Sequence, residues 1–348
     1  MSDSIRTIPV GVAPAYEVSI GPGLLQKSGT RLKPLLGECR VAVITDSTVA
    51  PLYLETVLQS LQQAGFATCS HIFPAGEGHK TLSTLSDLLE FLASQHLTRT
   101  DCVAALGGGV TGDMAGFAAA VYLRGIRCVQ LPTTLLAAVD SSVGGKTAID
   151  LPAGKNLAGA FCQPSLVLCD TDTLNSLPLD IFRDGCAEVI KYGVLYDPKL
   201  FAHLEEKGLS FDREAVITRC VELKRDVVME DEFDTGARMK LNLGHTVGHG
   251  VEAKSHFAIS HGKAVAIGMA IVSRASACAD TPRIVALLEQ FGLPTRTDYS
   301  ADDLFSYTLS DKKRSGGTVN LIIPHAIGDC AIVPTKVESL KSFIQAGL

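Results

Sequence analysis

The sequence predicts an α/β domain with a mainly parallel sheet, followed by a mainly α-helical domain. Up to about residue 178, short β-branched runs alternate with helical patterns, which is typical of βαβ units. Beyond Pro178 the hydrophobic period is helical almost throughout. The length of 348 residues suits two domains. We therefore divide the chain into residues 1–178 and 179–348.

The first domain is predicted from an alternation of short apolar runs and helical patterns. The expected strands are VAVIT at 41–45, ATCSHIF at 67–73, DCVAAL at 101–106, CVQLP at 128–132 and SLVLCD at 165–170. Helices are expected from Pro51 to about Ala64, over 81–95 and in the small-residue run MAGFAAAVY at 114–122. Five strands joined by helices favour a parallel sheet.

The second domain is predicted from helix-period segments. These segments lie at 181–197, 213–231, 237–255, 262–280 and 282–292. A short apolar stretch, TVNLIIP at 318–324, is the one candidate strand. A helical domain beside an α/β domain places the expected site in the cleft between them.

Composition excludes several classes of protein. With 31 Lys+Arg against 37 Asp+Glu, the net charge is −6, so nucleic acid is not an expected partner. The uncharged apolar run at 264–273 is far shorter than a membrane span, and no signal peptide is visible at the N-terminus. Ten cysteines without a CxxC pair indicate reduced, buried thiols and a cytoplasmic location.

A glycine cluster at residues 107–112, GGGVTG, stands where a predicted strand turns into a helix. Its G-x-G-x-x-G spacing lets backbone N–H groups approach a pyrophosphate. The usual acidic residue about 20 positions later is missing, and Asp46 is the best acid at a strand end. An ordinary glycine turn is the alternative reading, which the adjacent Asp113 and a second glycine cluster weaken.

That second cluster spans residues 140–161. Lys146, Lys155 and Asn156 lie there on a glycine-rich backbone, which suits a small phosphorylated ligand. The upstream glycine of a nucleotide triphosphatase loop is absent, so that class is disfavoured. A solvated loop with ordinary surface lysines is the alternative.

Histidines and carboxylates in the second domain predict a metal site. His245 and His249 are four residues apart and share one face of a helix, and Arg238, Asn242 and Glu252 extend this face into one continuous polar stripe. Thr246 stands where a zincin metalloprotease has glutamate. Glu188 and His261, on other predicted helices, supply further ligand types for a three-ligand catalytic metal site. Structural histidines and a surface Glu188–Lys191 pair are the alternatives.

Five long motifs in order resemble the 3-dehydroquinate synthase family. They are GGGVTGDMAGFAAAVYLRG, LPTTLLAAVDSSVGGKTAIDLPAGKNLAGAF, DGCAEVIKYG, RMKLNLGHTVGH and HGKAVAIGM. The similarity extends from about Asp46 to Lys313. It implies an NAD-binding N-terminal domain, a helical metal-binding C-terminal domain, and a homodimer.

The resemblance also implies roles for individual residues. The metal, zinc or cobalt, would be held by Glu188, His245 and His261. NAD would contact Asp46, Glu77, Lys80, Gly108, Gly109, Val110, Asp113, Thr133, Thr134, Asp140, Lys146 and Lys155. The substrate pocket would comprise Asp140, Lys146, Lys155, Asn156, Lys191, Lys224, Arg238, Asn242, His249 and Lys312, with Arg124 reaching the site of the neighbouring subunit. Lys313 is the alternative to Lys312.

The activity implied is conversion of 3-deoxy-D-arabino-heptulosonate 7-phosphate to 3-dehydroquinate and phosphate, in the shikimate pathway leading to chorismate and the aromatic amino acids. The reaction combines transient oxidation by NAD, elimination of phosphate, re-reduction and intramolecular aldol closure, so NAD is not consumed. Three alternatives stay open: another sugar phosphate cyclase that makes 2-epi-5-epi-valiolone or 2-deoxy-scyllo-inosose, a metal-dependent polyol dehydrogenase, and a non-catalytic NAD-binding protein. A dehydrogenase needs no phosphate site, so Lys146, Lys155, Asn156 and Arg238 argue against it. The same lysines together with an intact set of metal ligands argue against a non-catalytic protein.

Overall fold

The computed structural model describes residues 5–312 and 317–348. The chain divides into two compact units, which are described separately below. Unit 1 comprises Met1–Pro178 together with Lys224–Met229, and unit 2 comprises Leu179–Leu223 and Glu230–Leu348. The short segment Lys224–Met229 thus belongs to unit 1, although it lies far along the sequence from the rest of that unit.

Unit 1 contains nine strands, four α-helices and five shorter helical segments within its described residues. In chain order these are β1 (Arg6–Val10), β2 (Tyr16–Gly21), α1 (Ser28–Leu36), β3 (Arg40–Asp46), η1 (Ala50–Leu54), α2 (Glu55–Gln63), β4 (Ala67–Phe73), η2 (Glu77–His79), α3 (Leu82–Ser94), β5 (Cys102–Gly107), α4 (Gly109–Val121), η3 (Tyr122–Arg124), β6 (Arg127–Pro132), η4 (Ala137–Ser141), β7 (Lys146–Leu151), β8 (Gly154–Phe161), β9 (Leu166–Asp170) and η5 (Thr171–Asn175).

The main sheet has the strand order β1-β2-β9-β6-β5-β3-β4. All its pairs are parallel except β1 with β2. The five strands predicted from apolar runs are all present in it, and the predicted mainly parallel α/β fold is confirmed. The β1–β2 hairpin, which the apolar pattern did not reveal, extends the sheet beyond β9.

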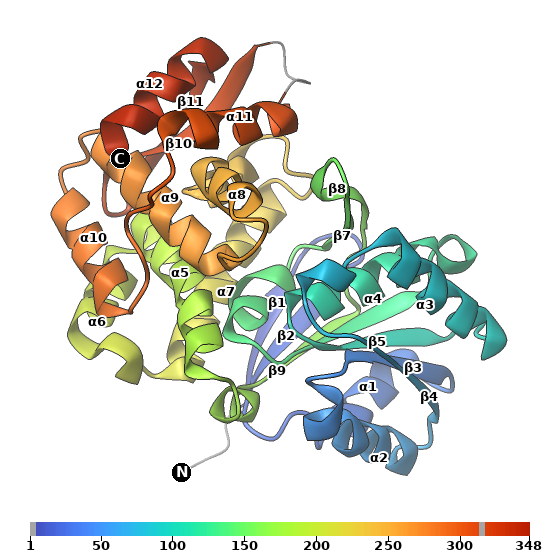
Figure 1. The fold of residues 1–348 in the computed structure, drawn as a ribbon. Coiled ribbons are helices and arrows are strands. Elements are labelled where there is room, and N and C mark those ends of the chain that lie inside the picture. Colours follow the sequence, from blue (N-terminus) through green and yellow to red (C-terminus); the bar gives the residue numbers. More distant parts are fainter. Residues whose placement is uncertain (1–4, 313–316) are drawn as a thin grey trace. The chain divides into compact units, whose positions relative to one another are not determined.

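Helices cover both faces of this sheet (Figure 1). On one face, α1 and α2 pack against β3 through Leu32, Leu61 and Val43. On the other face, α3 and α4 pack against the same strand, with Leu88 beside Ile44. Alternate residues of β3 therefore enter opposite core layers, as the two-residue period of a strand requires. Thr81 caps α3 by accepting a hydrogen bond from the N–H of Thr84.

Residues 140–161 are not the continuous glycine-rich loop that the sequence suggested. Lys146–Leu151 and Gly154–Phe161 form β7 and β8, which pair in an antiparallel hairpin. Gly159 permits this pairing, since a Cβ there would lie 2.1 Å from the carbonyl oxygen of Thr147. The composition concealed the strands because β8 is rich in small residues and has no buried position.

Unit 2 is mainly helical, as predicted. It contains α5 (Leu179–Tyr196), α6 (Pro198–Lys207), η6 (Gly208–Ser210), most of α7 (Arg213–Glu230), η7 (Ala237–Asn242), α8 (His245–Lys254), α9 (His261–Ala275), α10 (Thr281–Gln290), α11 (Ala301–Lys312), β10 (Thr318–Ala326), β11 (Asp329–Lys336) and α12 (Val337–Gly347). The predicted strand at 318–324 is present as part of β10, and β11 is its antiparallel partner.

One helix prediction in unit 2 is wrong. The segment 237–255 is not a single helix, because it splits into the 3₁₀ helix η7 and the α-helix α8. Gly244 lies between them with φ of +79°, in the left-handed region that glycine adopts without strain. A side chain there would also collide with α9, because a Cβ would lie 2.7 Å from the carbonyl oxygen of Val265. The close approach of α8 and α9 therefore depends on this break.

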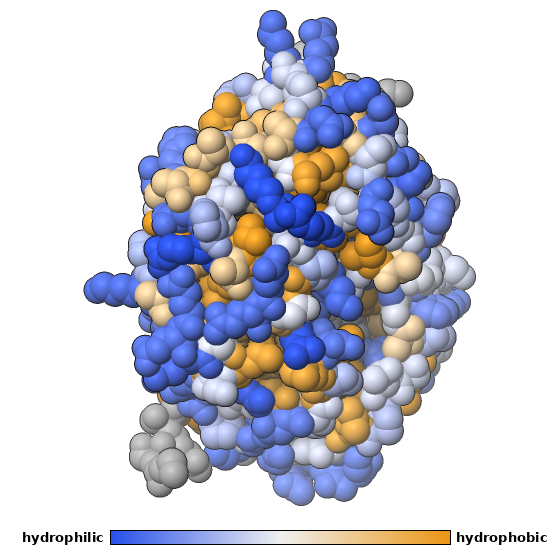
Figure 2. All heavy atoms as spheres, turned by 60° about the vertical axis from the view of Figure 1, so that its left-hand side comes forward, coloured by the Kyte–Doolittle hydropathy of each residue, from blue (hydrophilic) through white to orange (hydrophobic). Residues whose placement is uncertain are grey.

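Polar side chains cover much of the face of the molecule that Figure 2 shows. Figure 2 shows one face on which hydrophobic residues are interspersed among hydrophilic ones. Among the described residues, no helix is both long and apolar enough to cross a membrane.

Candidate active site

The predicted site residues fall in both units. In unit 1, they gather where the parallel strands of the main sheet end. Asp46 ends β3, and its Oδ1 accepts hydrogen bonds from the N–H groups of Thr48 (2.9 Å) and Val49 (3.0 Å). Its Oδ2 accepts a bond from the Thr111 hydroxyl (3.0 Å) on α4. Asp46 thus lies beside the glycine cluster at residues 107–112, although the cluster follows it by 61 to 66 positions in the sequence.

The glycine cluster forms the turn from β5 into α4. Gly108 is the N-cap residue of α4, and no side chain caps the helix. A Cβ at Gly108 would lie 3.0 Å from Thr134 Cγ2, so any larger residue would crowd this turn. The N–H of Thr133, at the end of the neighbouring strand β6, donates to the carbonyl of Gly107 (2.9 Å). A helix N-terminus without side chains over it fits a pyrophosphate group.

Four charged residues of unit 1 form two ion pairs next to this turn. Lys80 Nζ lies 2.6 Å from Asp113 Oδ2, and Lys155 Nζ lies 2.7 Å from Glu77 Oε1. Lys80 Nζ also donates to Asn156 Oδ1 (2.5 Å). The β7–β8 hairpin thereby brings Lys155 and Asn156 to residues that precede α3. The sequence alone did not indicate this proximity.

The remaining predicted residues of unit 1 differ in exposure. Asp140 forms an ion pair with Lys224, whose Nζ also donates to the carbonyl oxygen of Asp140 (2.6 Å). This contact explains why Lys224–Met229 is grouped with unit 1. Lys146 and Arg124 are exposed, and Arg124 has φ of +69°.

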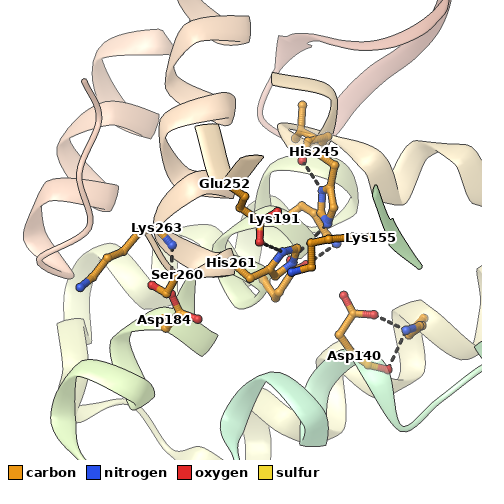
Figure 3. Close-up of polar contacts among 12 residues, drawn as sticks. Asp140, Lys155, Asp184, Lys191, His245, Glu252, Ser260, His261 and Lys263 are labelled. Carbon is orange, nitrogen blue, oxygen red and sulfur yellow. Dashed lines mark hydrogen bonds and ion pairs between the residues drawn. The ribbon is translucent and has the colours of Figure 1, made fainter. Parts of the chain in front are cut away.

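In unit 2, Glu188, His245 and His261 come together from three helices. Figure 3 shows the side chains of His245 and His261 turned toward the same point. Glu188 Oε1 lies 3.1 Å from His261 Nε2 and 3.4 Å from His245 Nε2. One ligand atom from each residue lies within 4.8 Å of the other two. Two imidazoles and one carboxylate with further coordination positions open are the donor set of a catalytic zinc site.

The other ring nitrogens are also occupied. His245 Nδ1 lies 3.1 Å from the carbonyl oxygen of Leu243, which favours a proton on Nδ1 and leaves Nε2 to face Glu188. His261 Nδ1 lies 3.5 Å from Glu252 Oε1. His249, Glu252 and His261 form a second, overlapping group of potential ligands. The two groups share His261 but use opposite sides of its ring.

Electrostatics around Glu188 distinguish the two histidines. Burial lowers the pKa of His245 to about 4, despite the neighbouring carboxylate. Burial also acts to lower the pKa of His261, but hydrogen bonds to Glu188 and Glu252 outweigh it and raise that pKa to about 10. Burial opposes ionisation of Glu188, yet Lys191 and the histidines hold its pKa well below the usual range. The site therefore carries one proton, on His261, at the position where a metal ion would bind.

Lys191, Arg238, Asn242 and His249 also belong to unit 2. Lys191 forms a buried ion pair with Glu188, so this pair is not on the surface. Arg238 lies on η7 and its Nη1 donates to the carbonyl of Glu232 (2.6 Å). The predicted single stripe of polar residues is wrong, because Arg238 and Asn242 precede the break at Gly244 and only His245, His249 and Glu252 share α8. His245 and His249 do lie together, with ring centroids 5.6 Å apart.

Two carboxylates that the sequence did not single out support this site. Asp231 accepts bonds from the N–H groups of Gly236 (2.7 Å) and Arg238 (3.0 Å), and so fixes the loop that leads into η7. Asp184 contacts the beginning of α9. Lys312 ends α11, but its side chain is not described, and Lys313 lies outside the described residues.

Comparison with known proteins identifies the family. The model of the 3-dehydroquinate synthase N-terminal domain matches residues 70–184, and that of the 3-dehydroquinate synthase C-terminal domain matches residues 185–314. The chain belongs to the 3-dehydroquinate synthase family. A 3-dehydroquinate synthase of Caulobacter vibrioides is 46% identical over 364 residues, covering 98% of each chain. One of Streptococcus suis is 43% identical over 343 residues, covering 95% of this chain and 97% of the relative.

Solved structures of other cyclases have the same fold as this member of the 3-dehydroquinate synthase family. A 2-deoxy-scyllo-inosose synthase with carbaglucose-6-phosphate, NAD⁺ and Co²⁺ has a TM-score of 0.87 and 25% identity, over 99% of this chain and 100% of that one. A 2-epi-5-epi-valiolone synthase of Streptomyces hygroscopicus with NAD⁺ and Zn²⁺ also reaches 0.87 at 25% identity, over 99% and 98%. A glycerol dehydrogenase of Schizosaccharomyces pombe, at a TM-score of 0.64 and 18% identity over 93% and 88%, shares the fold alone.

Proposed function

We propose that this protein is a 3-dehydroquinate synthase, a carbon–oxygen lyase that converts 3-deoxy-D-arabino-heptulosonate 7-phosphate to 3-dehydroquinate and phosphate. Membership of the family, at 43% to 46% identity over nearly the whole chain, supports this activity. The observation in the structure that carries the proposal is the convergence of Glu188, His245 and His261 within 4.8 Å.

Two bound groups complete the proposed site. NAD supplies a transient hydride acceptor, and a zinc or cobalt ion supplies Lewis-acid polarisation of a substrate oxygen. Glu188, His245 and His261 would hold the metal. Asp46 would accept hydrogen bonds from a ribose hydroxyl, and the N–H groups of Gly109 and Val110 would receive the pyrophosphate at the start of α4. The ion-paired residues around Lys80 and Asp113 would border the cofactor.

The chain's own polar residues would bind and orient the substrate. Lys146, Lys155 and Asn156 from unit 1, with Arg238, Asn242 and Lys312 from unit 2, would bind its carboxylate and phosphate, although the protein is acidic overall. His249 lies beside His245, with ring centroids 5.6 Å apart, and its imidazole is the group of this set that would transfer a proton to or from the substrate. Lys191 would balance the negative charge of Glu188. We assign the cofactor to the domain 1–178, and the metal to 179–348.

The proposal extends to assembly and location. We propose a homodimer in which Arg124 reaches the partner's site, and its exposed position at the end of η3 supports this role. Light scattering measures the oligomeric state. Arg124→Ala should then lower activity without changing the metal content. We also propose a cytoplasmic location, as expected from the sequence.

Parallel measurements of phosphate and NADH test the activity. With NAD and zinc, a 3-dehydroquinate synthase releases phosphate from the heptulosonate phosphate while NADH does not accumulate. Accumulation of NADH from a polyol without phosphate release would instead show a dehydrogenase. Absence of both would contradict an enzymatic function.

Another sugar phosphate cyclase activity is the second candidate, because two such enzymes share the fold at a TM-score of 0.87. Their identity of 25% is well below that of the 3-dehydroquinate synthases. The discriminating measurement is phosphate release from sugar phosphates that lack the carboxylate. Faster release from one of these than from the heptulosonate phosphate would favour the second candidate.

A further inference from the structure

The side chain of Asp184 lies on α5, one helical turn before the proposed ligand Glu188. Its Oδ1 accepts hydrogen bonds from the Ser260 hydroxyl (2.5 Å) and from the N–H of Lys263 (3.0 Å), which are drawn in Figure 3. These two partners lie on either side of His261 in the sequence. Asp184 therefore connects the helix that carries one proposed ligand to the first turn of the helix that carries another.

The backbone of Asp184 makes a third close approach to the same turn. A Cβ at Gly262 would lie 1.9 Å from the Asp184 carbonyl oxygen, so only glycine fits between α5 and α9 there. Asp184 thus contacts residues 260, 262 and 263, which enclose His261. The packing of Gly262 against α5 and the two hydrogen bonds to Asp184 together hold the main chain at His261 close to α5.

The hydrogen-bond acceptor that caps α9 comes from another helix. Ser260 is the N-cap residue of α9, but its side chain accepts no hydrogen bond from the helix. Its hydroxyl donates to Asp184 instead, and Asp184 supplies the acceptor that a first-turn N–H requires. A carboxylate is also favoured near a helix N-terminus. The cap of α9 is therefore supplied by α5, which makes the cap sensitive to the spacing of the two helices.

We propose that Asp184 is a positioning residue for the metal site, because it fixes the separation of Glu188 and His261. This inference rests on the proposed function, since it concerns the metal that this function requires. Glu188 Oε1 and His261 Nε2 are 3.1 Å apart. Metal affinity depends on ligands being held in place before binding, and residues that orient ligands typically contribute about 10–100-fold.

The experiment measures zinc affinity directly. Metal-depleted wild type, Asp184→Ala, Asp184→Asn and His245→Ala are titrated with zinc against a chromophoric chelator, and with cobalt while its visible absorption is recorded. We expect the wild type to bind one equivalent and His245→Ala to lose tight binding. Asp184→Ala should raise the zinc dissociation constant about tenfold or more. Asp184→Asn should remain within about twofold of the wild type, since asparagine caps helices as well as aspartate does.

A matched control separates positioning from general destabilisation. Asp197 caps α6 in the same unit by accepting bonds from the N–H groups of Lys199 (2.9 Å) and Leu200 (3.0 Å). Asp197→Ala removes a comparable cap, whose partners Lys199 and Leu200 are not proposed metal ligands, so the zinc affinity of this variant should match that of the wild type. Cobalt absorption should change in Asp184→Ala and not in Asp197→Ala.

The outcomes distinguish a failure of the positioning role of Asp184 from a failure of the proposed metal site. An Asp184→Ala variant that binds zinc as tightly as the wild type would overturn the inference alone, as would an equal loss in Asp197→Ala or in Asp184→Asn. If Asp184→Ala does not fold, Ser260→Ala removes one of the two bonds and should weaken zinc binding to a smaller extent. Unchanged affinity there would also overturn the inference. A wild type without zinc binding, or His245→Ala with full binding, would instead overturn the proposed metal site.

Discussion

Glu188 and Lys191 form an ion pair in which both side chains are only 1% exposed. They lie three residues apart on α5, so the helix itself brings them together. Burying two charges is costly unless each compensates the other. Glu188 also faces His245 and His261. The ammonium group of Lys191 therefore balances the charge of a carboxylate that is also a proposed metal ligand.

Replacing Lys191 should affect the metal-free protein most. Lys191→Met removes the ammonium group beside the buried Glu188 and leaves protonated His261 as its remaining cationic partner, and removing one partner of a buried pair typically costs up to about 3–5 kcal/mol. A bound divalent ion would supply the missing positive charge, so zinc should recover much of the loss. Urea unfolding with and without zinc measures this difference. Lys207→Met, which removes an exposed pair with Glu206, should change the free energy of unfolding far less. An equal loss in both states would contradict this account.

Zinc binding should release one proton at pH 7.5. Without metal, the pKa of His261 is raised to about 10, so His261 is protonated. Burial lowers the pKa of His245 to about 4, so that ring is already neutral. A metal must displace the proton of His261, and apparent affinity should therefore fall about tenfold for each pH unit of acidification between these values.

Calorimetry in buffers of different ionisation enthalpy counts the released protons. Glu252→Gln removes one of the two carboxylates that raise the pKa of His261, so fewer protons should be released at pH 7.5. Release of two protons by the wild type, or of none, would be inconsistent with this charge state.

Asp46 should make the protein prefer NAD to NADP. A 2′-phosphate would meet the carboxylate at the end of β3, which disfavours binding of the phosphorylated cofactor. Asp46→Asn removes the charge and keeps an acceptor for the N–H groups of Thr48 and Val49. The ratio of the affinity for NAD to the affinity for NADP should then fall about tenfold, equivalent to about 1.4 kcal/mol. NADH and NADPH fluorescence titrations measure it, and Thr111→Val, which removes only a hydrogen bond to Asp46, should leave the ratio unchanged. Equal preference in the wild type would rule out this role.

Arg238→Lys should remain damaging although the charge is kept. Arg238 is 2% exposed, and its Nη1 donates to the Glu232 carbonyl, which orients the planar guanidinium. Lysine lacks this fork and cannot bind an anion through two parallel bonds. We expect kcat/KM for the sugar phosphate to fall about tenfold or more, with NAD affinity nearly unchanged. Steady-state kinetics at varied NAD measure both, and a wild-type kcat/KM would contradict the proposed anion contact.

Five strands of the main sheet, β3, β4, β5, β6 and β9, were predictable because each is a short, largely apolar run close to turn residues. The same reasoning missed β7 and β8, where small and polar residues interrupt the run of large apolar side chains that marked the other strands. It also extended one helix across residues 237–255, since the apolar spacing continues through Gly244. Only the packing of α8 on α9 shows why the chain must break there.

The family, and the placement of the proposed metal ligands on separate helices, could be predicted from the amino-acid sequence alone. The sequence also placed His245 and His249 together, because a four-residue spacing brings side chains to one helix face. The approach of Glu188 to both histidines, the buried state of Lys191 and the contact of Asp184 with the first turn of α9 were decided by tertiary structure. Asp184 and Lys263 are 79 residues apart in the chain. A hydrogen bond over that separation depends on how α5 and α9 pack, which no local pattern of residues encodes.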